Sequence, residues 1–260
     1  MLIPRLNHLA GDGYSYFYFL SALAAMSQTN YVPFKKHIIQ AFYKPHHQRN
    51  ILKEFRFNES VAKSSPEKGA FTIEVEKISK KAIRAIIKNV ASELNQRIST
   101  NDILSAMVVK KTLEIEKENF GNDFQLTIPI DIRRQIKEYG LKFFGNGIMV
   151  NEINFKSEDI IRWDVNNIAM GIRNSMPVIT KELFVQFLAD IETMITEGQT
   201  NKLRPYDPER GCLVTNLSKL PANKLNFGNG DPDFIFTLTV ARNSAIILAD
   251  QDNFILRFVY

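Results

Sequence analysis

The sequence predicts an α/β protein in which a mixed β-sheet is flanked by helices. Three observations lead to this prediction. Several segments between residues 13 and 195 carry apolar residues at helical spacing, and short strand-like runs lie between them. From Leu213 onward, the chain consists of short β-rich runs separated by turn residues. With 260 residues, of which 45% are hydrophobic and 23% charged, the chain is long enough to bury a substantial core.

The first part of the chain predicts one short unit and a linker. Residues Gly13 to Ser27 are apolar and rich in aromatic side chains, which predicts a buried helix that follows a glycine turn. The stretch from Glu54 to Lys68 is polar and contains Ser64, Ser65 and Pro66, a composition typical of a linker. We therefore expect a first unit over residues 1–50, a linker over 51–70 and a larger unit over 71–260.

The larger unit begins with a strand and two capped helices. Phe71 to Val75 alternates as a strand does, and Ser79 can cap the basic amphipathic helix that follows. Ser99 and Asp102 have the spacing of a capping box, which predicts a second helix from Ser99.

Further strands and helices alternate along the rest of the chain. The patterns predict strands over Phe124–Ile130 and Gly147–Ile153, followed by helices over Ser157–Asn174 and Thr180–Ile195. In the tail they predict strands over Asp233–Ala241, Ser244–Ala249 and Asn253–Val259.

Composition argues against several functional classes. Cys212 is the single cysteine, which excludes an internal disulfide, and with His8, His37, His46 and His47 no zinc-ligand spacing can be assembled. No apolar stretch predicts a membrane span, and no secretion signal is visible, so we expect a cytoplasmic protein without a metal. The net charge of +5 is spread along amphipathic helices, which argues against nucleic-acid binding and is compatible with attraction of a phosphate-bearing small ligand.

The candidate catalytic motif lies near the start of the chain. His8, Asp12 and Gly13 fit the pattern HxxxDG. A histidine exchanges protons near neutral pH, so His8 could act as a general base, and Asp12 could support the loop through an ion pair. Gly13 allows close packing where the chain enters the helix. Taken alone, the motif also fits a histidine with a purely structural role.

Further segments, in the same order, resemble those of BAHD-type acyl-CoA-dependent acyltransferases, relatives of chloramphenicol acetyltransferase. The resemblance covers essentially the whole chain and begins at the HxxxDG motif. Besides that motif, it rests on Pro45 to Leu52, Ser99-Thr100, Leu104-Ser105-Ala106, Ile130-Asp131-Ile132-Arg133, Phe144-Gly145-Asn146, Val214-Thr215-Asn216 and Asn226-Phe227-Gly228-Asn229-Gly230.

The resemblance implies the carboxy-terminal portion of a two-domain, pseudo-symmetric transferase with a chloramphenicol acetyltransferase-like fold. It implies His8 as the general base of direct acyl transfer from acyl-CoA to a small-molecule hydroxyl or amine acceptor, without a metal or an acyl-enzyme. Thr215 and Asn216 become candidates for stabilising the oxyanion. Asn226, Phe227, Gly228 and Gly230 become a structural motif. The family has Asp at the position of Asn226, where it pairs with the arginine aligned to Arg133, so the resemblance implies a neutral hydrogen bond between Asn226 and Arg133 in place of an ion pair.

The resemblance also implies that one wall of the active-site tunnel lies in a first domain that this sequence does not contain. We therefore expect a second chain, or a second copy, to cover the first helix. Two functions remain open from the sequence. One is an acyltransferase, and the other is a non-catalytic remnant or interaction module that retains the fold.

Overall fold

The computed structural model describes residues 3–8, 10–29, 71–116, 120–141, 143–199, 203, 206–237 and 240–260. The predicted linker and the segment from Pro45 to Leu52 lie outside the described residues. Within the described parts, the chain forms α1 (Gly13–Thr29), β1 (Ile73–Ser79), α4 (Lys80–Leu94), α5 (Thr100–Ile115), β2 (Asp123–Asp131), β3 (Ile148–Lys156), α6 (Ser157–Arg162), α7 (Val165–Asn174), α8 (Lys181–Thr196), β4 (Gly211–Asn216), η2 (Ala222–Lys224), β5 (Ser244–Ala249) and β6 (Asn253–Val259).

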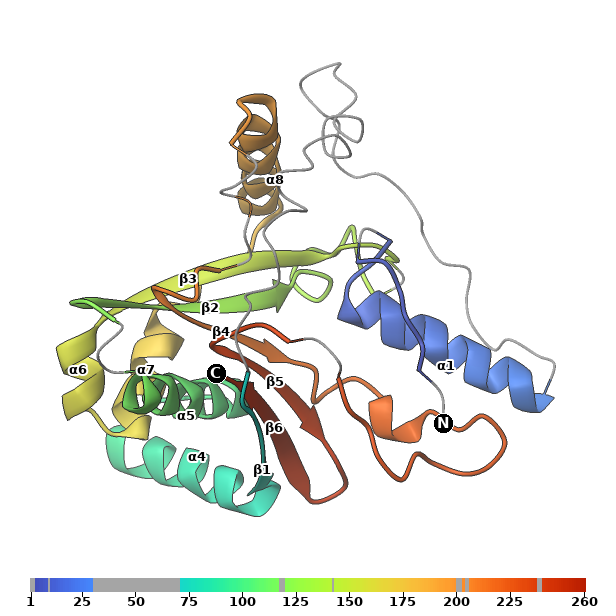
Figure 1. Ribbon diagram of the computed structural model, residues 1–260, viewed down its shortest axis with the longest axis horizontal. Coiled ribbons are helices and arrows are strands. Elements are labelled where there is room, and N and C mark those ends of the chain that lie inside the picture. The colour runs from blue at the N-terminus through green and yellow to red at the C-terminus, as the bar shows by residue number, and fades with distance from the viewer. Residues whose placement is uncertain are drawn as a thin grey trace.

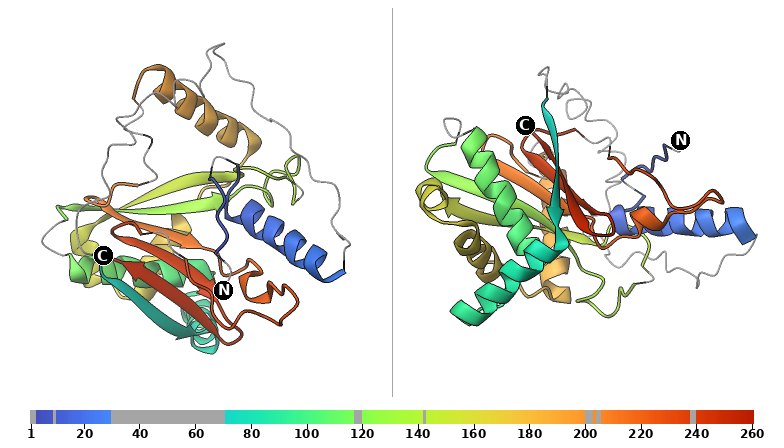
Figure 2. Two further views of the ribbon diagram at one scale, coloured as in Figure 1. Left: turned by 45° about the vertical axis from the view of Figure 1, so that its right-hand side comes forward. Right: turned by 90° about the horizontal axis from the view of Figure 1, so that it is seen from below.

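A six-stranded mixed sheet organises these elements. Its strand order is β1-β6-β5-β4-β2-β3 (Figure 1). The pairs β4/β5 and β2/β4 are parallel, whereas β1/β6, β5/β6 and β2/β3 are antiparallel. Helices α4, α5, α6 and α7 lie on one side of the sheet, and α1 lies beyond the end of β2 and β3 (Figure 2). The predicted α/β fold with a mixed sheet is confirmed.

Local capping explains where the two helices after β1 begin. The Ser79 hydroxyl accepts hydrogen bonds from the backbone N–H groups of Lys81 and Ala82 at the start of α4. At the start of α5, the Asp102 carboxylate accepts the Ser99 N–H at 2.6 Å and the Ser99 hydroxyl accepts the Asp102 N–H at 3.3 Å. These bonds satisfy N–H groups that have no partner within the helix, and both predicted caps are confirmed.

Two apolar clusters hold the fold together. The larger lies between the sheet and α5, α6 and α7, and it includes the fully buried Leu104, Phe124 and Ile247. The smaller lies between the segment after β2 and the start of α8, and it includes Ile132, Tyr139 and Phe184. The second cluster fixes the segment between β2 and β3, which carries much of the candidate site.

Two predicted elements differ in kind from the structure, and the strand predicted over Phe71–Val75 lies further along the chain, as β1 over Ile73–Ser79. The helix predicted over Ser157–Asn174 is two helices, α6 and α7, because Trp163 adopts an extended backbone and the Asp164 carboxylate caps α7 by accepting the Asn167 N–H. The strand predicted over Asp233–Ala241 is wrong for the described residues 233–237 and 240–241, which pair with no strand. Its residues alternate as those of a strand do, but alternation alone does not provide a neighbouring strand with which to pair.

Candidate active site

The HxxxDG motif forms the turn that leads into α1. Asp12 lies immediately before the helix and is only 3% exposed. One of its carboxylate oxygens, Oδ1, accepts the Ser15 N–H at 3.0 Å, as the side chain of a helix N-cap does. The sequence therefore folds this acid inward at the point where the helix needs an acceptor.

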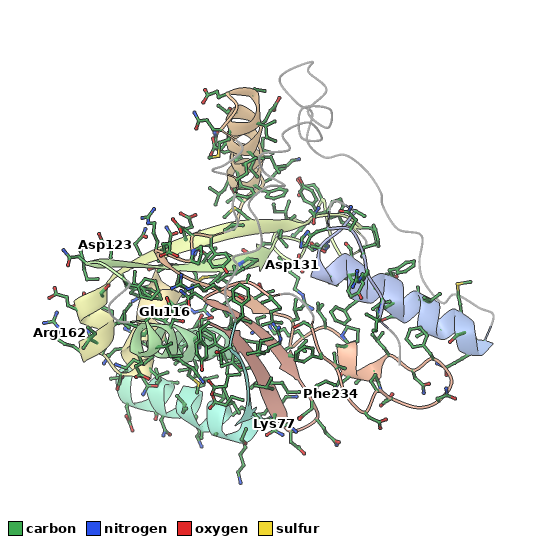
Figure 3. The ribbon with its side chains drawn as sticks, viewed as in Figure 1. Lys77, Glu116, Asp123, Asp131, Arg162 and Phe234 are labelled. Carbon is green, nitrogen blue, oxygen red and sulfur yellow. The ribbon has the colours of Figure 1, made fainter. Side chains whose placement is uncertain are left out.

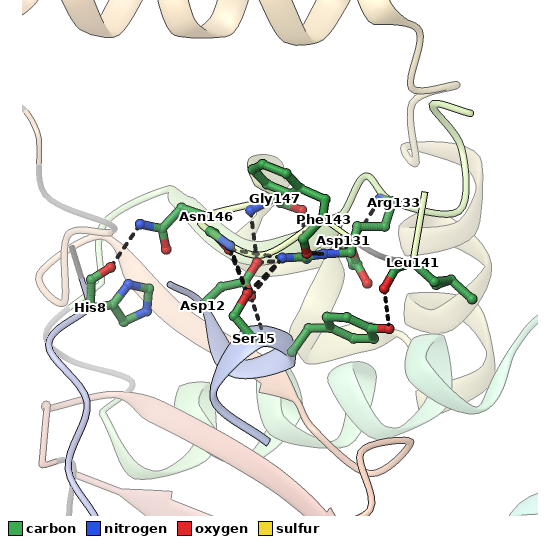
Figure 4. A network of polar contacts seen from close by, with 11 residues as sticks. His8, Asp12, Ser15, Asp131, Arg133, Leu141, Phe143, Asn146 and Gly147 are labelled. Atoms are coloured by element: carbon green, nitrogen blue, oxygen red, sulfur yellow. Dashed lines mark hydrogen bonds and ion pairs between the residues drawn. The ribbon is translucent and has the colours of Figure 1, made fainter. Parts of the chain in front are cut away.

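The Asp12 carboxylate also forms a buried bidentate ion pair with Arg133. Arg133 Nη1 donates to Asp12 Oδ2 at 2.8 Å, and Nη2 donates to Oδ1 at 3.0 Å. The Gly147 N–H donates to Oδ2 at 2.9 Å, so with Ser15 the carboxylate accepts four hydrogen bonds (Figure 4). An ionised carboxylate has about four acceptor sites, so Asp12 has no free site to orient a histidine.

The remaining donors of Arg133 are also used. Nε donates to the Phe143 carbonyl at 3.0 Å, Nη1 to Asp131 at 3.0 Å and Nη2 to the Gly145 carbonyl at 2.9 Å. The guanidinium carbon lies 4.6 Å from the centre of the Tyr14 ring and 5.3 Å from that of Phe143. Burial raises the pKa of the Tyr14 phenol, against the opposing effect of the Arg133 charge. Its hydroxyl donates to the Leu141 carbonyl at 2.8 Å.

Two glycines and a serine make room for this network. A Cβ atom on Gly147 would lie 2.8 Å from the Arg133 guanidinium carbon, and one on Gly145 would lie 3.0 Å from the Phe143 ring. Gly145 also has a φ of +145°, in the region that favours glycine. Between them, the fully buried Ser15 hydroxyl donates to the Gly145 carbonyl at 2.9 Å and accepts the Gly145 N–H at 3.0 Å. The segment after β2 is thus attached directly to the start of α1.

His8 lies on the solvent side of the same turn. His8 is exposed, whereas Asp12 is buried. The His8 carbonyl accepts a hydrogen bond from the Asn146 side-chain amide at 2.8 Å (Figure 4). His8 and Asp12 are therefore directed to different surroundings, and the network does not join them into a catalytic dyad.

The oxyanion candidates lie at the end of β4, on opposite faces of the sheet. Val214 belongs to the main core, and Asn216, two residues on, donates from its side chain to Asn101 in the first turn of α5 at 2.9 Å. Because successive strand residues alternate, Thr215 points away from α5. The hydroxyl of this half-buried residue has no hydrogen-bond partner among the described residues.

The end of β4 also approaches the start of α1. A Cβ atom on Gly13 would lie 3.1 Å from a methyl group of Leu217, the residue after Asn216. A larger residue at position 13 would require the Leu217 side chain to move by a few tenths of an ångström. Gly13 thus permits close packing between the HxxxDG turn and the strand that carries Thr215.

The prediction of a hydrogen bond between Asn226 and Arg133 is wrong. Arg133 is paired with Asp12, while the Asn226 side-chain oxygen accepts the N–H groups of Gly228 at 2.8 Å and Gly230 at 3.1 Å. Both glycines have positive φ angles, +109° and +94°, which a tight turn requires of them. Asn226 therefore stabilises its own turn, in which Phe227 is half-buried, and its carbonyl accepts a hydrogen bond from Gln28 near the end of α1.

Sequence reasoning did not assign roles to several members of the network. Ser15 could have been found, because it is three residues after an Asp that precedes a helix, the spacing of an N-cap contact. Gly147 and Tyr14 carry no such local signal, because their contacts are to residues more than 100 positions away. Asn146 was expected only as part of the Phe144-Gly145-Asn146 segment.

Within the described parts of the chain, no three His, Cys, Asp or Glu side chains gather in a way that could hold a metal ion. None of the described helices combines the length and apolarity needed to cross a bilayer.

Comparison with known proteins shows which family the chain belongs to. The model of the Transferase family matches residues 5–253. No curated protein gives a significant sequence match. Vinorine synthase is similar in structure, with a TM-score of 0.65 and 17% identity over 98% of this chain and 57% of its own.

Two further similar structures are complexes of TRI101 with coenzyme A and T-2. The F. graminearum protein gives a TM-score of 0.70 at 12% identity, over 96% of this chain and 60% of its own. The F. sporotrichioides protein gives 0.67 at 12% identity, over 97% and 61%. The chain thus spans somewhat more than half the length of these neighbours. It belongs to the Transferase family and has the chloramphenicol acetyltransferase-like fold of the BAHD acyltransferases.

Proposed function

We propose that this chain is an acyltransferase that moves an acyl group from an acyl-CoA thioester to a hydroxyl or amine of a small molecule. The proposal assigns His8 as the general base and involves neither a metal nor a covalent acyl-enzyme. Acyl-CoA is a co-substrate in this reaction. Family membership and the HxxxDG motif support the proposal.

The contrast between His8 and Asp12 carries the assignment. A general base must reach its substrate, and His8 is exposed. The turn that carries His8 is held in place by the buried Asp12–Arg133 pair. Because all four acceptor sites of Asp12 are occupied, His8 acts without a carboxylate partner from this motif. Asp12 is then a structural residue that holds the turn on which the base is presented.

In the proposed mechanism, a His8 ring nitrogen removes the proton from the acceptor as its oxygen or nitrogen attacks the thioester carbonyl carbon. A tetrahedral oxyanion forms, and it collapses as the carbon–sulfur bond breaks. The protonated imidazole then returns its proton to the departing thiolate. This sequence uses one residue first as base and then as acid.

Of the two oxyanion candidates, we assign the role to Thr215. The Asn216 amide already donates to Asn101 and accepts the Ser218 N–H, whereas the Thr215 hydroxyl is free of such bonds among the described residues. A donor that is not used by the fold can bind the developing oxyanion without first breaking another bond. The contact between Leu217 and Gly13 keeps this strand end close to the HxxxDG turn.

The class of substrates is proposed from the similar structures. TRI101 has been solved with coenzyme A together with T-2 or deoxynivalenol, which are small molecules. By likeness, we propose a small-molecule acceptor and a coenzyme A thioester for this chain.

The apolar surface of α1 supports the proposal of a partner. Phe19, Leu23 and Met26 are 48%, 43% and 45% exposed and recur at steps of four and three residues along the helix. Such a stripe is ordinarily buried against another surface. We propose that a second polypeptide, or a second copy of this chain, covers it and completes the site.

An assay of coenzyme A release separates this function from that of a non-catalytic module. Purified protein is incubated with acetyl-CoA, and the free thiol is measured with and without candidate alcohols and amines. Release that disappears in His8→Ala supports the transferase. Release that is equal in the two proteins, or absent with and without the partner half, favours the interaction module.

A further inference from the structure

The segment between Phe143 and Gly147 holds the HxxxDG turn at two points. At the helix end, the Gly147 N–H donates to the Asp12 carboxylate at 2.9 Å. At the other end, Asn146 donates from its side chain to the His8 carbonyl at 2.8 Å. Two adjacent residues, Asn146 and Gly147, therefore form hydrogen bonds with His8 and Asp12, respectively.

The contact with Asn146 constrains the backbone beside the His8 ring. The turn is closed by a hydrogen bond from the Ala10 N–H to the Asn7 carbonyl at 2.8 Å, and the His8 carbonyl lies within that turn. Fixing this carbonyl fixes the peptide plane that follows His8. Because that plane is rigid, the hydrogen bond from Asn146 restricts rotation about the His8 Cα–C bond and so holds the backbone from which the imidazole projects.

We propose that Asn146 is a positioning residue that orients His8 for proton transfer. The position requires a side chain that is short and donates a hydrogen bond, because its partner is a carbonyl oxygen. Aspartate has nearly the same shape but only acceptors when ionised, so it would repel the His8 carbonyl. Asn146 is itself exposed and lies outside the buried Asp12–Arg133 pair, so the fold does not depend on it for packing.

Asn146→Asp tests the proposal with a substitution that changes little besides the donor. Asn89→Asp is the matched control, because it makes the same change of charge at an exposed position of α4. The first measurement is hydrogen exchange of the Ala10 amide, which needs no enzymatic activity. Loss of one hydrogen bond should speed this exchange about 3- to 10-fold in Asn146→Asp and leave it unchanged in Asn89→Asp.

The second measurement is the rate of coenzyme A release from acetyl-CoA, and this arm rests on the proposed function. We expect kcat to fall about 3- to 10-fold while KM and Tm stay the same, because an orienting contact acts on the reacting geometry. A fall in Tm with no separate effect on kcat would mean that Asn146 is merely structural and would overturn the proposal. Unchanged Ala10 exchange would also overturn it.

The two arms separate this proposal from the proposed function. If the wild-type protein shows no coenzyme A release with its partner present, the transferase assignment fails. Faster exchange of the Ala10 amide in Asn146→Asp would then still show that the Asn146 side chain stabilises the turn that contains His8. If the wild-type protein is active and Asn146→Asp retains its kcat, the positioning role is wrong while the transferase assignment stands.

Discussion

Arg133 and Asp12, which are 121 positions apart in the sequence, are joined by two hydrogen bonds of 2.8 and 3.0 Å. Their side chains are 0% and 2% exposed. This pair joins the start of α1 to the segment after β2, and it sets the position of the turn that carries His8. The relationship leads to distinct expectations for the two polar residues of the HxxxDG motif.

His8→Ala is expected to remove transferase activity without loosening the fold. A general base contributes about 10² to 10⁴ in rate, whereas an exposed imidazole contributes little packing. The measurements are kcat for coenzyme A release and Tm, taken on the same preparation. Activity within a few fold of the wild type would remove His8 from the mechanism.

Asp12→Ala is expected to destabilise the protein by about 3 to 5 kcal/mol, since it leaves the buried Arg133 charge without its partner. Chemical denaturation gives the free energy of unfolding. The control is Asp123→Ala, which removes an ion pair with Lys156 whose two side chains are 63% and 60% exposed. Exposed pairs contribute little, so equal losses for the two variants would contradict the structural role of Asp12.

Thr215→Val is expected to lower kcat by about 10²-fold, because valine keeps the shape of threonine but cannot donate to an oxyanion. Asn216→Ala should act mainly through stability, since its amide bonds to Asn101 and to Ser218. Steady-state kinetics and thermal melts distinguish the two effects. A large loss of kcat in Asn216→Ala alone would transfer the oxyanion role to that residue.

Because the Cys212 thiol is buried, we expect the protein to lose stability at high pH. Burial raises the pKa of this thiol from the ordinary value of 9.0 to about 12. Between these values the folded state retains a proton that the unfolded state has lost, so stability falls as the pH rises through this range. The contribution is about 1.4 kcal/mol per pH unit, measured as the difference in unfolding free energy between the wild type and Cys212→Ala. A difference that does not change between pH 8 and 10.5 would argue against burial of the thiol.

The exposed stripe of α1 predicts that the isolated chain is not a fully competent monomer. Light scattering should detect self-association or capture of a partner half, and Leu23→Ser should weaken either one by removing apolar contact area. Leu94→Ser is the control, because Leu94 is 49% exposed at the end of α4. A stable monomer with full transferase turnover would show that no partner is needed.

The side chains that form the helix caps lie within a few residues of the helices they begin, so the sequence alone determined those starts. Ser79 and the Ser99–Asp102 capping box act over three residues or fewer, and the patterns there predict α4 and α5 correctly. The same reasoning missed the break between α6 and α7, because the apolar spacing continues through Trp163 and Asp164. The alternation over Asp233–Ala241 also misled, since a strand needs a neighbour and periodicity does not supply one; Phe234, labelled in Figure 3, is 74% exposed.

For the candidate site, the sequence by itself determined the residue types, and only the tertiary structure decided how they are paired. The HxxxDG pattern identifies a histidine that can exchange protons and an acid four residues later, but it does not state which cation the acid meets. That cation is Arg133, which is brought to Asp12 because the segment between β2 and β3 folds against α1. The family resemblance predicts instead that Arg133 bonds to Asn226, whose side chain stabilises its own turn. A buried charge is tolerated only where a partner of opposite charge saturates it, and such pairing depends on contacts between distant parts of the chain.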